Sequence, residues 1–180
     1  MSSTAFRPAA LITGASSGLG WHIARVLSAR GFHVVLAARR SQALEALKLN
    51  IEASGVSADA VSLDVKDEAS VGAAFAAIDS KGIRVGVVVN NAGISEAKPA
   101  LEISGAEWDR VMDTNLRGVF LVAQAAARRM KEFGGGSIVN VASILGHRVS
   151  GSVASYAASK AGVVRLTEAL ALEWARYGIR

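Results

Sequence analysis

A phenol and an amine stand four residues apart in the segment YAASK, which runs from Tyr156 to Lys160. In a helix this spacing places both side chains on one face. An unperturbed phenol has a pKa of about 10, too high for easy proton exchange at neutral pH, and a nearby ammonium lowers it by favouring the phenolate. The pair therefore predicts an acid–base unit, although an unrelated surface tyrosine and lysine would give the same pattern.

A serine lies upstream of this pair, in the loop after an apolar, strand-like run. This residue is Ser143, in the segment IVNVAS. Its hydroxyl could hold the oxygen of a substrate carbonyl while that oxygen is protonated. Ser143 is therefore a candidate for orienting the substrate.

Glycine and serine crowd the segment TGASSGLG, residues 13–20, directly behind an apolar run. Glycines in a strand-to-helix loop allow a tight turn and the close approach of a phosphate, and the helix N-terminus favours its negative charge. The spacing G-x-x-x-G-x-G differs from the commonest dinucleotide fingerprint, and a glycine-rich turn without a ligand is the alternative. The candidate cofactor contacts are Gly14, Ser16, Ser17, Gly18, Leu19 and Gly20, with the serines as hydroxyl donors.

Two arginines, Arg39 and Arg40, follow the second apolar run. A site that prefers NAD would carry a carboxylate here to bind the ribose 2′-hydroxyl, and none is present. Guanidinium groups instead suit a 2′-phosphate, because their donors match its oxygens. We therefore expect NADP rather than NAD, with Arg39 the stronger candidate; a solvated start of the next helix is the alternative.

Two further strand ends carry candidate contacts. Asp64 could accept a hydrogen bond from an adenine amine while Val65 packs on the ring, although a helix-entry turn explains the same residues. The segment NNAG, residues 90–93, ends the fourth apolar run with residues that tolerate unusual backbone angles, and its amide side chains could tie neighbouring strands. The candidate contacts in this segment are Asn91, Ala92 and Gly93.

The elements that must position these residues alternate along the chain. Short apolar runs at 9–13, 33–38, 60–63, 85–90 and 137–142 are typical of strands covered on both faces. Helical spacing marks the stretches between them, with Ser41 as an expected N-cap, a long region stopped by the glycines at 134–136, and a last helix over 155–177. The alternation predicts an α/β fold, a doubly wound parallel sheet in a Rossmann-type three-layer α/β/α sandwich, with ligands beyond the carboxyl ends of its strands.

Composition sets the outer bounds. The 180 residues suit one domain, and 51% hydrophobic with 19% charged residues is enough for a real core. With no cysteine and three histidines at no ligand spacing, we expect no metal centre. The net charge is +5, but the basic residues are scattered along the chain, so a nucleic-acid-binding domain is disfavoured. No run is long enough for a membrane span and the start lacks a signal-peptide core, so we expect a cytoplasmic protein.

Together these motifs resemble the short-chain dehydrogenase/reductase family, in its ordinary single-domain branch. The resemblance rests on TGASSGLG, NNAG, Asn115 in DTNLRG, Ser143 in IVNVAS, and YAASK, in that order. It implies hydride transfer between a nicotinamide and a carbonyl or alcohol carbon. Tyr156 would be the acid/base, Lys160 would hold the nicotinamide ribose and lower the pKa of the tyrosine, Ser143 would orient the substrate oxygen, and Asn115 would help to position Lys160 through a water-linked proton path.

The resemblance also sets expectations beyond the site. Family members continue past the position that corresponds to Arg180 with a sixth strand and a substrate lid, so we expect this domain to be incomplete at its C-terminus, after an N-terminal lead over residues 1–8. A small carbonyl or alcohol substrate, such as a 3-oxoacyl thioester, and a homodimer or homotetramer are expected by analogy. The alternative is a nucleotide-sensing binding protein without catalysis, which would have no need of Ser143, Tyr156 and Lys160 together.

Overall fold

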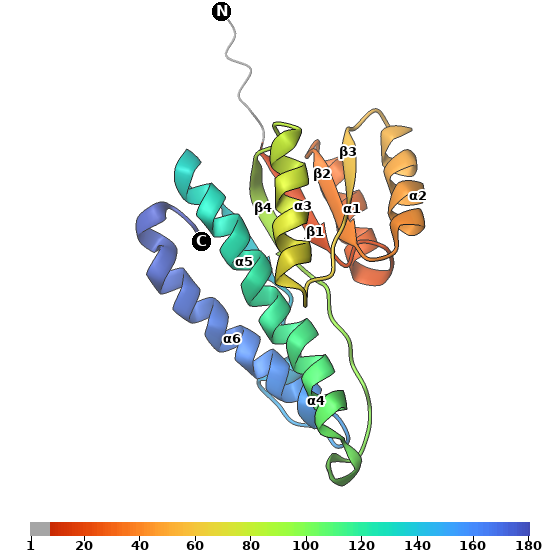
Figure 1. Cartoon of the computed structure of the whole chain (residues 1–180), viewed down its shortest axis with the longest axis vertical. Helices are drawn as coiled ribbons and strands as arrows, with labels where there is room; N and C mark the ends of the chain where they lie inside the picture. Colours follow the sequence, from red (N-terminus) through yellow and green to blue (C-terminus); the bar gives the residue numbers. More distant parts are fainter. Residues whose placement is uncertain (1–7) are drawn as a thin grey trace, which may run out of the picture.

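The computed structural model describes residues 8–180 as a parallel sheet with helices on both faces (Figure 1). The lead expected over residues 1–8 lies outside the described residues except for Pro8. The sheet has the strand order β3-β2-β1-β4-β5, so the chain reverses its direction of winding between β3 and β4. This is the doubly wound arrangement predicted from the sequence. The strands are β1 Ala9–Thr13, β2 Val34–Ala38, β3 Ala58–Ser62, β4 Val85–Asn90 and β5 Ser137–Asn140.

The central strands are apolar on both faces because both faces are covered. Every residue of β1 and β2 is buried, and Ile12 lies opposite Leu36 in their register. The edge strand β3 differs, since Asp59 and Ser62 escape full burial. A continuous apolar run therefore indicates a central strand of this sheet, as parallel sheets require.

Two helical layers sandwich the sheet. One hydrophobic cluster packs α1 and α2 against one face, through side chains such as Ala24, Leu44 and Ile51. The other packs α3 and α5 against the opposite face, through Phe75 and Val122, with α6 beside α5 (Figure 1). The helices are α1 Gly18–Ala29, α2 Ser41–Glu52, α3 Glu68–Ser80, α4 Gly105–Met112, α5 Gly118–Met130 and α6 Ala154–Trp174, with short 3-10 turns at η1 Ala100–Glu102, η3 Lys131–Phe133, η4 Ile144–Gly146 and η5 Ala175–Tyr177.

Three local expectations need correction. The third strand occupies β3 rather than 60–63, because Val34 to Ala38 pair residue by residue with Ala58 to Ser62. The N-cap of α2 is Arg40, whose carbonyl accepts from the amide of Leu44, so Ser41 is the first helical residue. The fifth strand ends at Asn140, where the β4–β5 pairing stops.

The long fourth helical region is divided by a wider turn. A π-helical segment, η2 Asp113–Arg117, joins α4 to α5, and Gly134 stops the region with a left-handed φ of +94°. In Figure 1, α4 and the first turns of α6 project beyond the carboxyl edge of the sheet. The polar residues that follow the strands therefore lie on the same side of the sheet as α4 and the first turns of α6.

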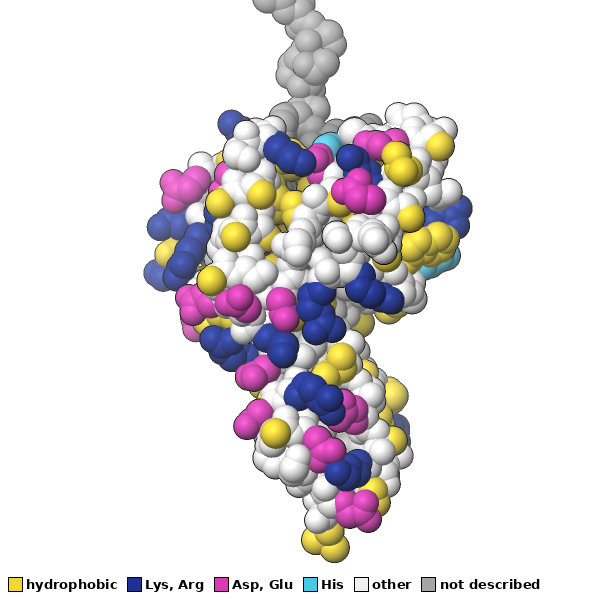
Figure 2. Space-filling view, turned by 45° about the vertical axis from the view of Figure 1, so that its right-hand side comes forward, with side chains coloured by type: hydrophobic (Ala, Val, Ile, Leu, Met, Phe, Trp, Pro, Cys, Tyr) yellow, Lys and Arg dark blue, Asp and Glu magenta, His cyan; other side chains and the backbone are white. Residues whose placement is uncertain are grey.

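Charges of both signs are intermixed on the face seen in Figure 2. Pairs such as Arg129 with Asp79 and Lys98 with Glu107 bring opposite charges together. The view shows no band of one sign of the kind that a nucleic-acid surface carries. No helix within residues 8–180 combines the length and apolar character needed to cross a membrane.

Candidate active site

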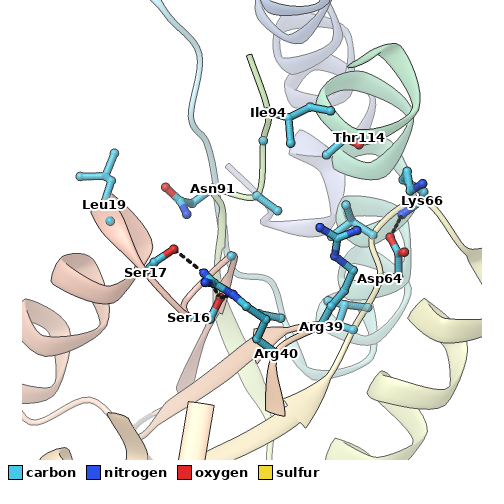
Figure 3. Close-up of a pocket in the computed structure, with 17 residues that line it drawn as sticks. Ser16, Ser17, Leu19, Arg39, Arg40, Asp64, Lys66, Asn91, Ile94 and Thr114 are labelled. Atoms are coloured by element: carbon cyan, nitrogen blue, oxygen red, sulfur yellow. Dashed lines mark hydrogen bonds between the residues drawn. The ribbon is translucent and has the colours of Figure 1, made fainter. Parts of the chain in front are cut away.

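A cleft of about 420 Å³ opens at the carboxyl ends of β1 to β4 (Figure 3). Most of the residues predicted to contact a dinucleotide line this cleft. It also has lining residues for which the sequence suggested no role, although Ile94 directly follows NNAG and Thr114 directly precedes Asn115. The lining comprises Gly14, Ser16, Ser17, Gly18, Leu19, Ala38, Arg39, Arg40, Leu63, Asp64, Val65, Lys66, Asn91, Ala92, Gly93, Ile94 and Thr114.

The glycine-rich loop joins β1 to α1 at the floor of the cleft. Gly14 has a φ of +66°, and a Cβ there would lie 3.0 Å from the Cα of Ala92. Gly20 lies behind the lining, where a Cβ would meet the carbonyl oxygen of Gly14 at 2.5 Å. Ser17 is the N-cap of α1 but its hydroxyl makes no capping hydrogen bond. The first N–H groups of α1 thus lack a side-chain cap at the cleft, which is the arrangement that favours a bound phosphate.

The two arginines after β2 point in different directions (Figure 3). Arg40 donates from Nη2 to the hydroxyls of Ser16 at 3.0 Å and Ser17 at 2.6 Å. Arg39 points away from these serines, toward the side of the cleft that holds Asp64. The cleft therefore carries two exposed guanidinium groups, one tied to the glycine-rich loop.

The loop after β3 forms the wall beside Arg39. The Asp64 carboxylate accepts from the amide of Lys66 at 3.1 Å, and the amide of Asp64 donates to the Ser70 hydroxyl at 3.0 Å. Val65 is buried next to it, with 7% of its surface exposed. The helix-entry turn and a cofactor contact are thus compatible here, because the same residues make the turn and line the cleft.

Thr13 holds the NNAG segment against β1, a role that the sequence alone did not suggest. Its hydroxyl oxygen accepts from the amides of Asn91 and Ala92, each at 3.0 Å. The side chain of Asn91 returns a bond from Nδ2 to the carbonyl of Thr13 at 3.0 Å. Asn90 ties β4 to its other neighbouring strand, β5, because its Nδ2 donates to the side-chain oxygen of Asn140 at 2.9 Å. The predicted tie between neighbouring strands by amide side chains is confirmed.

Lys160 lies outside the cleft lining, behind Gly93, and is buried with 4% of its surface exposed. Its Nζ donates to the carbonyl of Val141 at 2.6 Å and lies 5.7 Å from the ring centre of Tyr156. A Cβ placed on Gly93 would lie 3.8 Å from this Nζ. Burial lowers the pKa of Lys160, because desolvation disfavours its ammonium form. The lysine thus joins the cleft lining to the predicted acid–base pair.

Ser143 and Tyr156 lie outside the cleft lining, on the loop and helix that meet beside it. Ser143 caps the short turn η4, and its hydroxyl accepts from the amide of Leu145 at 3.2 Å. This turn packs on α6 so closely that a Cβ on Gly146 would lie 2.9 Å from the carbonyl oxygen of Lys160. Tyr156 lies in the first turn of α6 and is half-buried.

Asn115 is fully buried in the π-helical segment and binds the chain after NNAG. Its Oδ1 accepts from the amide of Ile94 and its Nδ2 donates to the carbonyl of the same residue, both at 2.8 Å. Nδ2 also lies 3.1 Å from the hydroxyl of Ser159, the neighbour of Lys160 in the chain. Asn115 therefore connects the cleft wall to the helix that carries the acid–base pair. In the part of the chain that the structure describes, no three His, Cys, Asp or Glu side chains gather as a metal site.

Known proteins share both the sequence and this architecture. Residues 8–180 match the family profile described as short chain dehydrogenase. Gluconate 5-dehydrogenase of Gluconobacter oxydans is 38% identical over 171 residues, covering 95% of this chain and 67% of the relative. The 3-oxoacyl-acyl-carrier-protein reductase FabG of Staphylococcus aureus is 39% identical over 171 residues, covering 94% and 70%. The chain thus spans about two thirds of the length of the curated relatives it matches.

Solved structures agree with the sequence relatives. The gluconate 5-dehydrogenase of Burkholderia cenocepacia, in complex with NADP and tartrate, superimposes with a TM-score of 0.93 at 36% identity, covering 96% of this chain and 68% of that one. These relatives are named as dehydrogenases and reductases, which disfavours the alternative of a nucleotide-sensing protein without catalysis. The chain belongs to the short-chain dehydrogenase family.

Proposed function

We propose that the protein is an NADP-dependent oxidoreductase that transfers a hydride between a nicotinamide and a carbonyl or secondary alcohol carbon. The observation that carries the proposal is the continuity of the cleft. It begins at two arginines, passes the N-terminus of α1 and ends at Gly93, beside the ammonium of Lys160. Cationic groups at both ends and a helix N-terminus between them match the charges along a phosphorylated dinucleotide.

The residues present fit NADP in four places. Arg39, or Arg39 with Arg40, would bind the 2′-phosphate. Asp64 and Val65 would contact the adenine, and Asn91 to Gly93 would form the wall along the nicotinamide half. The diphosphate would lie against the loop from Gly14 to Gly20, with Ser16, Ser17 and Leu19 beside it. When bound, NADP supplies or accepts the hydride.

The protein's own side chains would handle the proton and the substrate oxygen. The hydroxyl of Tyr156 would donate a proton to the carbonyl oxygen in reduction and accept it in oxidation. Lys160 would favour the phenolate and bind the nicotinamide ribose, and the Ser143 hydroxyl would hold the substrate oxygen. Asn115 would keep the cleft wall at Ile94 and the helix carrying Lys160 in a fixed relation.

The substrate would be a small molecule, and the names of the relatives suggest which chemistry to try first. One relative is named for gluconate, a sugar acid, and the FabG relative is named as a 3-oxoacyl-acyl-carrier-protein reductase. A keto sugar acid and a 3-oxoacyl thioester are therefore the first candidates. We further propose a cytoplasmic protein that assembles as a homodimer or homotetramer.

A screen of NADPH consumption by the purified protein tests the proposal. The panel contains keto sugar acids, 3-oxoacyl thioesters and simple ketones, with NADH in parallel reactions. The proposal predicts substrate-dependent loss of NADPH absorbance for at least one class, faster than with NADH. Titration of both cofactors onto the protein runs alongside, and a protein that binds neither of them would overturn the proposal.

A further inference from the structure

The π-helical segment η2 contacts two walls of the cleft. A π-helical segment is rare, and where one interrupts an α-helix it frequently lies at a functional site. Here it contains Thr114, which lines the cleft, and Asn115, which binds the backbone of Ile94. One side of the segment is thus attached to the wall beside Lys160.

Arg117 attaches the same segment to the opposite wall. Its Nη1 donates to the carbonyl oxygen of Lys66 at 2.5 Å. Gly118, the next residue, packs on Val65 so closely that a Cβ on the glycine would lie 2.8 Å from the Cγ2 of that valine. The loop Asp64–Lys66 therefore rests on the end of the π-segment, with Arg117 as its hydrogen-bonding contact.

The spacing of the two contact residues explains how one short segment reaches two walls. Residues two apart in a helix point in nearly opposite directions. Asn115 accordingly faces the chain after β4, while Arg117 faces the loop after β3. Leu116 lies between them and packs on Gly162 of α6, which anchors the segment from a third side.

The bond to Lys66 bears on the shape of the proposed adenine pocket. The carbonyl of Lys66 is held by Arg117, and its amide donates to the Asp64 carboxylate. The backbone of Lys66 is therefore fixed at both its polar groups, and with it the orientation of Asp64. Because Arg117 is exposed, the bond depends on its geometry rather than on burial.

We propose that Arg117 is a positioning residue for the adenine half of the cofactor. It would hold the loop Asp64–Lys66 at the distance from the NNAG wall that the dinucleotide needs, while Asn115 holds the nicotinamide end. This inference rests on the function proposed above. It predicts that Arg117 affects the adenine half of the ligand and spares the other half.

Titration of Arg117→Ala with three probes tests the inference: NADPH, its adenine half 2′,5′-ADP, and its nicotinamide half NMN. We expect the Kd of NADPH and of 2′,5′-ADP to rise about fivefold, which corresponds to ~1 kcal/mol, and the Kd of NMN to stay unchanged. Arg117→Lys restores part of the binding, because an ammonium can also donate to the Lys66 carbonyl. Arg165→Ala is the matched control, since that exposed arginine pairs with Glu168 within α6.

Each outcome separates this inference from the proposed function. If the wild-type protein binds NADPH and Arg117→Ala binds it with the same Kd, the inference about Arg117 is overturned and the proposed function is not. Equal losses for 2′,5′-ADP and NMN also overturn it, because they indicate general loosening of the fold. A wild-type protein that binds no dinucleotide overturns both. If Arg117→Ala fails to fold, Arg117→Met keeps the apolar stem without the donors and is predicted to give the same selective loss.

Discussion

In the proposed chemistry, the hydroxyl of Tyr156 exchanges a proton with the substrate oxygen. Tyr156→Phe removes this hydroxyl and keeps the ring beside Lys160. We expect turnover to fall by about 10²- to 10⁴-fold, the usual contribution of general acid–base catalysis, while the Kd of NADPH changes little. Steady-state rates and cofactor titration measure the two effects separately. Retained turnover would contradict the role given to Tyr156; Tyr177→Phe is the control tyrosine variant.

The proposed preference for NADP depends on Arg39. Arg39→Ala removes charge-assisted hydrogen bonds to a 2′-phosphate that NADH does not have. We expect the Kd of NADPH to rise about 10- to 100-fold and that of NADH to change less than about twofold. Equal losses for the two cofactors would mean that the arginine does not bind the 2′-phosphate. Arg40→Ala is measured beside it, because Arg40 already donates to the hydroxyls of Ser16 and Ser17 and a smaller loss of NADPH binding is expected there.

Lys160, the proposed partner of Tyr156, is a candidate site residue whose burial costs stability. Its pKa is lowered by burial, so between this lowered pKa and the unfolded value near 10.5 the unfolded chain binds more protons and stability rises with pH. Lys160→Met removes the buried charge. We therefore expect the stability of this variant relative to wild type to be most favourable at neutral pH and to decline as the pH approaches 10.5. Urea unfolding at several pH values measures it, with Lys48→Met as a surface control; a constant difference would contradict the expectation.

Among the elements, the sequence predicted the existence and order of the strands, and it predicted the exact ends of strands and helices less well. Strands such as Val34–Ala38 are recognisable because a doubly covered strand must be apolar on both faces. The N-cap at Arg40 could not be predicted because its side chain makes no capping hydrogen bond; the start of α2 is marked only by the bond from the Leu44 amide to the Arg40 carbonyl. The π-turn could not be read from DTNLR, since it depends on Asn115, Leu116 and Arg117 finding partners far away in the chain.

The start of α4 carries a pH-dependent cap. Hydrogen bonds from Lys98, from the Ser104 amide and from the Ser104 hydroxyl lower the pKa of Glu107 to about 2. Because the folded pKa lies below the ordinary value of 4.5, the stabilisation is complete above 4.5 and is lost as the pH falls toward 2. We expect Glu107→Ala to speed hydrogen exchange in the first turn of α4 at neutral pH.

Hydrogen exchange measured at low pH tests the predicted direction of this pH dependence. The difference between Glu107→Ala and wild type should vanish as the pH approaches 2. Glu107→Gln should keep part of the protection, since its amide oxygen can still accept from the Ser104 amide. A difference that persists at the lowest pH would contradict the assignment of the cap to the ionised carboxylate.

At the scale of the whole molecule, the sheet topology brings the candidate residues together. The strands end at one edge, so residues of the loop 14–19 and residues 39–40, 64–65 and 91–93 meet in one cleft although they are far apart in the chain. This gathering was predictable because parallel strands share a carboxyl edge. The ties that fix its shape were not, because Thr13, Ser159 and Arg117 act through hydrogen bonds to distant backbone or side-chain groups. Such partners appear only once the chain is folded.

We propose that a single cleft binds NADP, with Arg39 at one end and Lys160 beside the other. A crystal structure of the protein grown with NADP tests it most directly. We expect the 2′-phosphate beside Arg39, the diphosphate at the first turn of α1, and the nicotinamide ribose within hydrogen-bond distance of the Lys160 ammonium. Nucleotide bound elsewhere, or bound here with the nicotinamide turned away from Tyr156 and Lys160, would contradict it.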